Sequence, residues 1–220
     1  MHTKRLILTL QIAMGVLASG YGVMFTMLDD WRSEYGIQET GLSMIIAVGF
    51  FTSFIAQLTI APYADRGHAR KLMTVGMAAN AAGALIMAFG SSLPMFLLGR
   101  FVMGVGAGIA IPAIKRIVIV SDPENMGGNL GRGVSIEVGG FAIGPVIAAL
   151  TVDFINLAAP FILIAVLITI AGVIISRLNI TETAIEDRTA ERFAIDLLKN
   201  RAVLGSILVG VALYVMIGVY

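Results

Sequence analysis

Long apolar runs alternate with short charged segments along the whole chain. Each run is close to or longer than the ~20 residues that a helix rising 1.5 Å per residue needs to cross a bilayer core of ~30 Å. The chain therefore reads as a series of membrane-spanning helices. The predicted spans are 6–28, 41–63, 72–90, 95–120, 131–152, 158–176 and 202–220.

The composition agrees with this pattern. The chain is 58% hydrophobic and 13% charged, with a mean hydropathy of +0.92, whereas soluble domains average about 45–50% and 25%. With no cysteine, disulfides, thiolate catalysis and cysteine metal sites are excluded. His2 and His68 are too far apart in the sequence to suggest a metal site.

The basic residues fall on one side of the predicted membrane. All Lys and Arg other than Arg32 and Arg100 lie in the amino terminus, in alternate loops or near the helix ends beside them. Cytoplasmic loops carry this excess, so we expect a multi-pass protein of the cell membrane with a cytoplasmic amino terminus. The cytoplasmic residues are Lys4, Arg5, Arg66, Arg70, Lys71, Lys115, Arg116, Arg132, Arg177, Arg188, Arg192, Lys199 and Arg201.

Two connecting segments carry further expectations. Residues 29–35 form a predicted exterior turn, with Trp31 and Tyr35 at interfacial depth. Residues 121–129 are rich in Gly, Asn, Asp and Pro and predict a loop before the fifth helix opens near Gly131.

The charged island at 61–72 joins the second and third spans. Its residues Ala64, Asp65, Arg66, Arg70 and Lys71 resemble the loop motif G-x-L-A-D-R-x-G-R-[KR]-[KR] of major facilitator superfamily transporters. The resemblance implies a cytoplasmic gate in which Asp65, Arg66 and Arg70 form ion pairs. The plain alternative is that the basic residues only fix the topology.

Arg100 lies inside the fourth span. Burying a cation in lipid costs about 2.5–3.5 kcal/mol or more, so the side chain should face the protein interior. The run through Met103, Gly104 and Gly108 resembles the superfamily pattern L-x-x-x-R-x-x-Q-G-x-G-A, which implies an arginine bearing on proton coupling or substrate. The alternative is that Arg100 snorkels to the exterior headgroups.

The fifth span carries the most specific motif. Gly131, Gly140, Gly144 and Pro145 resemble the antiporter signature G-x8-G-x3-G-P-x2-G-G, although alanines replace its last two glycines. Small residues at such spacing allow close helix packing, and the proline permits a kink. Glu137 shares a helical face with Gly133, Gly140 and Gly144, and two roles stay open for it. It exchanges protons, or it is a fixed structural partner of a cation among Arg132, Lys115 and Arg116.

Polar side chains on weakly polar helix faces are candidate cavity-lining residues. Along the first span, Gln11 and Ser19 share a face with Gly15, Gly22 and Thr26. Helix packing explains these faces about as well. The candidates are Gln11, Ser19, Gln57, Asn80 and Tyr214.

The predicted fold is an all-α integral membrane protein. Residues 1–177 resemble the amino-terminal six-helix bundle of a major facilitator, built of two three-helix inverted repeats. Residues 178–201 resemble its cytoplasmic central loop, and 202–220 the start of a seventh helix. The resemblance implies a second six-helix bundle, missing from these 220 residues, or another copy of the chain as a partner.

The implied function is secondary active transport of a small organic solute across the lipid bilayer by alternating access, as proton-coupled efflux. No phosphate-binding loop, His-Glu-x-x-His motif or Ser/His/Asp set is present. We therefore expect no enzyme activity, no cofactor beyond a proton gradient and no nucleic acid partner. The alternatives are a non-transporting half-transporter serving assembly or regulation, and a proton-symporting uptake carrier.

Overall fold

The computed structural model of the chain describes residues 2–178, 180, 201, 204–205 and 208. The chain divides into two units, Met1–Ile185 and Glu186–Tyr220. The first unit is a bundle of helices, and its described residues contain no β-strand. The predicted central loop and seventh helix, with Tyr214, lie almost entirely outside the described residues.

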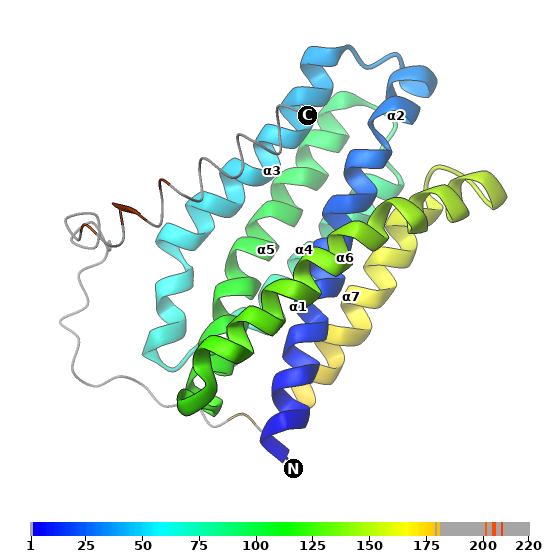
Figure 1. Cartoon of the computed structure of the whole chain (residues 1–220). Coiled ribbons are helices and arrows are strands. Elements are labelled where there is room, and N and C mark those ends of the chain that lie inside the picture. The colour runs from blue at the N-terminus through cyan, green and yellow to red at the C-terminus, as the bar shows by residue number, and fades with distance from the viewer. Residues whose placement is uncertain (1, 179, 181–200, 202–203, 206–207, 209–220) are drawn as a thin grey trace. The chain divides into compact units, whose positions relative to one another are not determined.

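Six of the helices in the described part of the chain are long and apolar enough to cross a membrane, as the sequence predicts for the first six spans. Figure 1 shows them side by side, with the amino terminus at one end of the bundle and the short helix α2 at the other. In chain order the elements are α1 (His2–Thr26), α2 (Leu28–Tyr35), α3 (Glu39–Thr59), η1 (Ala61–Arg66), α4 (Ala69–Ala88), α5 (Leu93–Ser121), η2 (Pro123–Asn125), α6 (Met126–Phe154) and α7 (Ala159–Arg177).

Local chemistry ends the helices where the chain must turn. Gly36 closes α2 with φ 63° and Gly67 closes η1 with φ 82°, a left-handed conformation that favours glycine. Before α7, the side-chain oxygen of Asn156 accepts hydrogen bonds from the backbone N–H groups of Ala158 and Ala159, each at 3.0 Å. This bonding satisfies donors at the helix start that have no intrahelical partner.

The six spanning helices form two sets of three, and the helices of one set pack mainly against helices of the other. The first set is α1, α3 and α4, and the second is α5, α6 and α7. The leading helix of each set packs against the middle helix of the other, so α1 lies on α6 and α5 lies on α3 (Figure 1). The two last helices, α4 and α7, pack together. This reciprocal packing fits the two three-helix repeats expected from the sequence.

Glycines bring the α1–α6 pair into backbone contact. A Cβ atom at Gly140 would overlap the carbonyl oxygen of Gly15, and one at Gly144 would meet the backbone of Gly22 at 2.5 Å. Such close approach lets van der Waals contact hold helices together where lipid supplies no hydrophobic driving force. The small-residue face of the first span is thus a packing face.

The α3–α5 pair uses the same device. A Cβ at Gly104 would overlap the Gly49 carbonyl oxygen and the Thr52 hydroxyl, and one at Gly108 would overlap the Ser53 carbonyl oxygen. The packing role predicted for Gly104, Gly108, Gly140 and Gly144 therefore agrees with their positions.

The segment after α1, expected as a turn, is the helix α2, and Trp31 is buried in the bundle at 1% exposure. Its ring stacks on Phe96 at 4.5 Å and on Phe161 at 5.6 Å between centroids. The large indole buries much apolar area against these two rings. Through Trp31, α2 therefore packs on α5 and α7 at this end of the bundle.

The expected loop at 121–129 is also wrong in extent. Only η2 separates the two long helices, and α6 starts at Met126, five residues before Gly131. Around a Cβ at Gly131 there is no atom within 4 Å. The close packing predicted for Gly131 does not occur in this bundle, because Gly131 lies on an exposed side of α6 while its neighbours Asn129 and Gly133 face α1.

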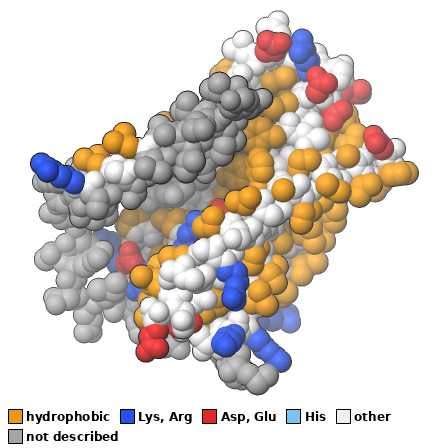
Figure 2. Space-filling view, viewed as in Figure 1, with side chains coloured by type: hydrophobic (Ala, Val, Ile, Leu, Met, Phe, Trp, Pro, Cys, Tyr) orange, Lys and Arg blue, Asp and Glu red, His pale blue; other side chains and the backbone are white. Residues whose placement is uncertain are grey.

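The long helices differ greatly in how much of their surface the bundle covers. Of the apolar window of each, 67% is buried in α1 and 61% in α5, against 33% in α3 and 17% in α6. Charged side chains gather toward the ends of the bundle in Figure 2, and hydrophobic ones cover much of its length. Both α3 and α6 therefore keep wide apolar surfaces for lipid or for another set of helices.

Candidate functional site

The loop between α3 and α4 is tied to α5 by an ion pair. Asp65 lies in η1, and its Oδ1 atom is 2.7 Å from Nε of Arg116. The Arg116 side chain is only 13% exposed, so the pair is partly shielded from water. Ion pairs were expected among Asp65, Arg66 and Arg70 of the loop, but the structure pairs Asp65 with a residue from the C-terminal half of α5.

The other basic residues of this loop have different surroundings. The Arg66 guanidinium lies over the Tyr63 ring, 4.9 Å from its centroid. Arg70 donates a hydrogen bond to the backbone carbonyl of Ser176, near the end of α7. A cation suits the carbonyl end of a helix, so Arg70 fastens α4 to α7. Lys71 is exposed.

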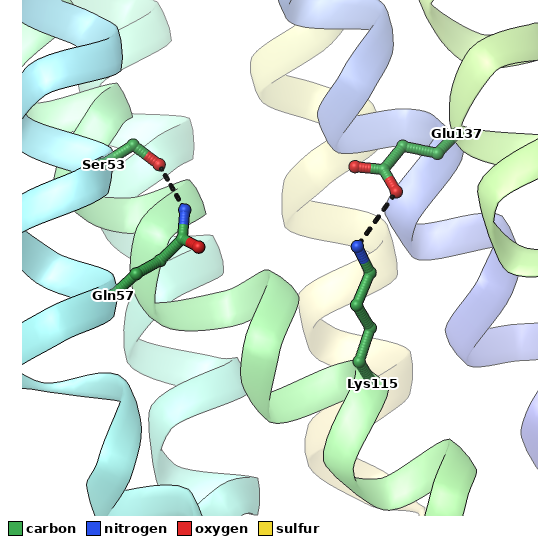
Figure 3. Close-up of polar contacts among 4 residues, drawn as sticks. All are labelled: Ser53, Gln57, Lys115 and Glu137. Atoms are coloured by element: carbon green, nitrogen blue, oxygen red, sulfur yellow. Dashed lines mark hydrogen bonds and ion pairs between the residues drawn. The ribbon is translucent and has the colours of Figure 1, made fainter. Parts of the chain in front are cut away.

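Lys115, next to Arg116, makes the second ion pair of α5. Its Nζ lies 3.4 Å from Oε2 of Glu137 on α6, and both side chains are partly exposed. Figure 3 shows Lys115 reaching across from α5 to Glu137, and nearby on α3 the Gln57 amide donating to the Ser53 hydroxyl at 3.3 Å. Two consecutive residues of α5 thus hold the η1 loop and the carboxylate of α6.

Arg100 is fully buried, as expected of an interior residue. Its Nε donates to the Ile45 carbonyl at 3.3 Å, and its guanidinium carbon lies 4.9 Å from the centroid of the Tyr21 ring. Neither terminal nitrogen has a hydrogen-bond partner. Within the described range, no carboxylate pairs with this cation.

Two residues around Arg100 were missed from the sequence. The guanidinium crosses α3 where Gly49 leaves room for it, since a Cβ there would overlap its terminal nitrogen. Tyr21 approaches from α1. The spacing of four from Gly49 to Ser53 and on to Gln57 could have marked this face of α3, whereas nothing local points to Tyr21.

Three of the five candidate cavity residues are buried between helices. Gln11 donates to the Asn129 carbonyl at 2.7 Å, Asn80 to the Met103 carbonyl at 2.8 Å, and Ser19 to the Val16 carbonyl at 2.7 Å. Contacts inside the bundle take up these three side chains, since Gln11 and Asn80 bond to neighbouring helices and Ser19 bonds within its own helix. Gln57 is exposed, and its role in lining a cavity stays a prediction.

A small polar pocket lies where α5 gives way to α6, with a volume of about 340 Å³. The Asp122 carboxylate accepts hydrogen bonds from the amides of Asn125 and Asn129, which hold its pKa below the usual value. The pocket also includes Lys4 and Arg132. Of the three cations expected as structural partners of Glu137, which are Arg132, Lys115 and Arg116, the structure pairs Lys115 with it.

The family model for the Major Facilitator Superfamily matches residues 10–220. The chain belongs to the Major Facilitator Superfamily. As a member of the Major Facilitator Superfamily with six spanning helices among its described residues, it is a multi-pass membrane protein of a transporter family.

One curated protein is similar to part of this Major Facilitator Superfamily member. It is a triacylglyceride transporter of Mycolicibacterium smegmatis, 29% identical over 93 residues, which is 41% of this chain. The matched region spans 17% of the relative's length. This similarity supports a membrane transporter at the level of the family.

Proposed function

We propose that this chain is part of a secondary active transporter that moves a small organic solute by alternating access, coupled to proton flow in the direction of efflux. The energy source is a proton gradient, and no enzymatic step is involved. The membrane is the cell membrane, with the amino terminus in the cytoplasm, as the distribution of basic residues favours. A second six-helix bundle, or another copy of the chain, completes the path.

The Lys115–Glu137 pair is the observation that carries this proposal. It joins two membrane-spanning helices, and its side chains stay partly exposed. Protonation of Glu137 would cancel the negative charge and release Lys115, which removes a link between α5 and α6. A carboxylate inside the membrane is expensive unless it has such a use or partner. The glycine-lined contacts beside it allow one helix to slide past another.

The test is solute-dependent proton movement in sealed proteoliposomes. The purified chain is reconstituted with trapped pyranine, and ethidium, rhodamine and oleate are added one at a time under an imposed pH difference. Proton movement that depends on both protein and solute supports the proposal. Glu137→Gln should abolish it, whereas Glu124→Gln, an exposed carboxylate outside the pair, should not. No solute response from the unchanged protein would contradict transport by this chain.

Asp65→Asn is expected to loosen the loop between α3 and α4. The change removes the ion pair with Arg116, and a partly exposed pair is worth about 0.5–1 kcal/mol. The loop should therefore be labelled about 2–5 times faster by a thiol reagent at a single introduced cysteine, His68→Cys, since the chain has no other cysteine. The matched control is Lys71→Gln, which changes an exposed charge of the same loop. Unchanged labelling in Asp65→Asn would contradict the gate.

A second candidate function is that of a non-transporting component serving assembly or regulation. The wide uncovered surface of α6 favours it, because such a surface also suits stable association with another membrane protein. Pyranine measurements separate the two, since an assembly component moves no protons in response to any solute. An uptake carrier would show the same coupling with solute and protons entering together.

A further inference from the structure

Arg100 is a buried cation that no carboxylate pairs with among the described residues. It is fully buried, its Nε is occupied by the Ile45 carbonyl, and both terminal nitrogens lack partners. Burying a cation without a counter-charge is costly, and a buried donor left without an acceptor adds to that cost. The pair of free nitrogens is the edge of the guanidinium that binds carboxylate or phosphate in a forked geometry.

Neither α5, which carries Arg100, nor the neighbouring α4 contains an acidic residue. The Glu137 carboxylate on α6 is held by Lys115, and α3 offers only Thr52, Ser53 and Gln57 as polar side chains in its middle turns. Over residues 3–26, α1 contains no acidic residue. Among the described residues, therefore, none of these helices supplies the missing negative charge.

An aromatic surface adjoins Arg100. The Tyr21 ring lies against the guanidinium and stacks on Phe50 at 5.6 Å between centroids. Phe25 lies 6.5 Å from Phe50 and 5.9 Å from Phe141, so the rings run across α1, α3 and α6. Phe25, Phe50 and Phe141 are each at least 37% exposed. Aromatic faces of this kind bind apolar chains.

We propose that Arg100 and these rings bind an amphiphilic anion, with its carboxylate or phosphate on the free guanidinium nitrogens and its hydrocarbon part along Phe25, Phe50 and Phe141. Tyr21 covers the guanidinium in the empty site and turns aside as the anion enters. The inference rests on the proposed transport function and names its substrate class. Tyr21 and Gly49 are positioning residues, since one covers the cation and the other leaves the space that it occupies.

Equilibrium binding tests the proposal without any gradient. The full chain in neutral maltoside micelles is photolabelled with a diazirine-bearing palmitate, and competition by palmitate, lysophosphatidate and hexadecanol is measured. We expect the two anions to compete at least about tenfold better than the alcohol, because a hydrogen bond to a charged group contributes about that factor or more. The two anions distinguish a fatty acid from a lipid phosphate as the preferred head.

Variants distinguish the contribution of the Arg100 charge to binding from that of the aromatic rings. Arg100→Met should lower the apparent affinity for both anions about tenfold and leave hexadecanol unchanged, which also shows that the protein is folded. Gly49→Ala keeps the charge but displaces the guanidinium, so it should lower the affinity for both anions in the same way. Phe50→Ala should lower the affinity for all three compounds. Lys71→Gln, at an exposed cation, should change none of them.

Equal competition by palmitate and hexadecanol would overturn the proposal, as would anion binding that Arg100→Met leaves intact or that depends on Lys71. These outcomes leave the proposed transport function standing, because a different solute could still drive proton movement in the liposome assay. Conversely, anion binding that requires Arg100 in a chain that moves no protons would support this inference and count against transport.

Discussion

Gly140→Ala is expected to destabilise the bundle strongly. The new methyl group would overlap the Gly15 carbonyl oxygen, a backbone atom that no rotamer change can move away. Overpacking costs about 1–3 kcal/mol, and here α1 and α6 must separate along their whole contact. For a chain of this size, 3 kcal/mol corresponds to a fall in melting temperature of about 6–12 °C. The measurement is thermal loss of the monodisperse peak in fluorescence-detected size-exclusion chromatography.

The matched control is Gly139→Ala, the same substitution at the preceding residue of the same helix. A Cβ at Gly139 meets no atom within 4 Å. Because alanine favours a helix over glycine by up to about 1 kcal/mol, this variant should be as stable as the original or slightly more stable. Equal melting temperatures for the two variants would show that α1 and α6 are not in the backbone contact described above.

Arg100→Met is expected to slow solute-dependent proton movement at least about tenfold without lowering the melting temperature. The side chain is buried with two unsatisfied nitrogens, so replacing it with an apolar residue of similar length removes a desolvated charge. If Arg100 holds a charged group during transport, losing about 1.5–3 kcal/mol of interaction slows transport at least about tenfold. The pyranine assay and the chromatographic melting assay, run on the same preparation, measure both effects.

Arg100→Lys is the companion variant. It keeps the charge but replaces the planar fork with a point charge that cannot bind bidentately, so partial activity is expected. A structural arginine would behave differently, since Arg100→Met would then lower the melting temperature and transport together. Full transport by Arg100→Met would remove Arg100 from the mechanism.

The spans and the small-residue faces could be predicted from the sequence. Runs of apolar residues and the spacing of Gly104, Gly108, Gly140 and Gly144 are local patterns, and bilayer thickness converts them directly into helices and contacts. The burial of Arg100 could also be predicted, because a cation within a membrane span is too costly to expose to lipid and must face the protein interior. The extension of α6 back to Met126 could not, since glycine and asparagine are common in loops but do not forbid a helix.

Side-chain partners between distant segments were beyond local reasoning. Asp65 pairs with Arg116 of α5 rather than with Arg66 or Arg70, which are its neighbours in the sequence. Trp31 faces inward because α2 folds over Phe96 and Phe161, which come from two other helices. Neither contact could be predicted from the residues within one helical turn of Asp65 or Trp31.

By itself the sequence determined that this chain is a series of membrane-spanning helices with glycine contact faces, and it pointed to the superfamily through its motifs. The tertiary structure alone decided that Lys115 holds Glu137, that Tyr21 covers Arg100, and that Gln11 and Asn80 serve packing. The reason is physical: the number and length of spans follow from composition along the chain, whereas the partner of a polar group depends on which helices the folded bundle places beside it.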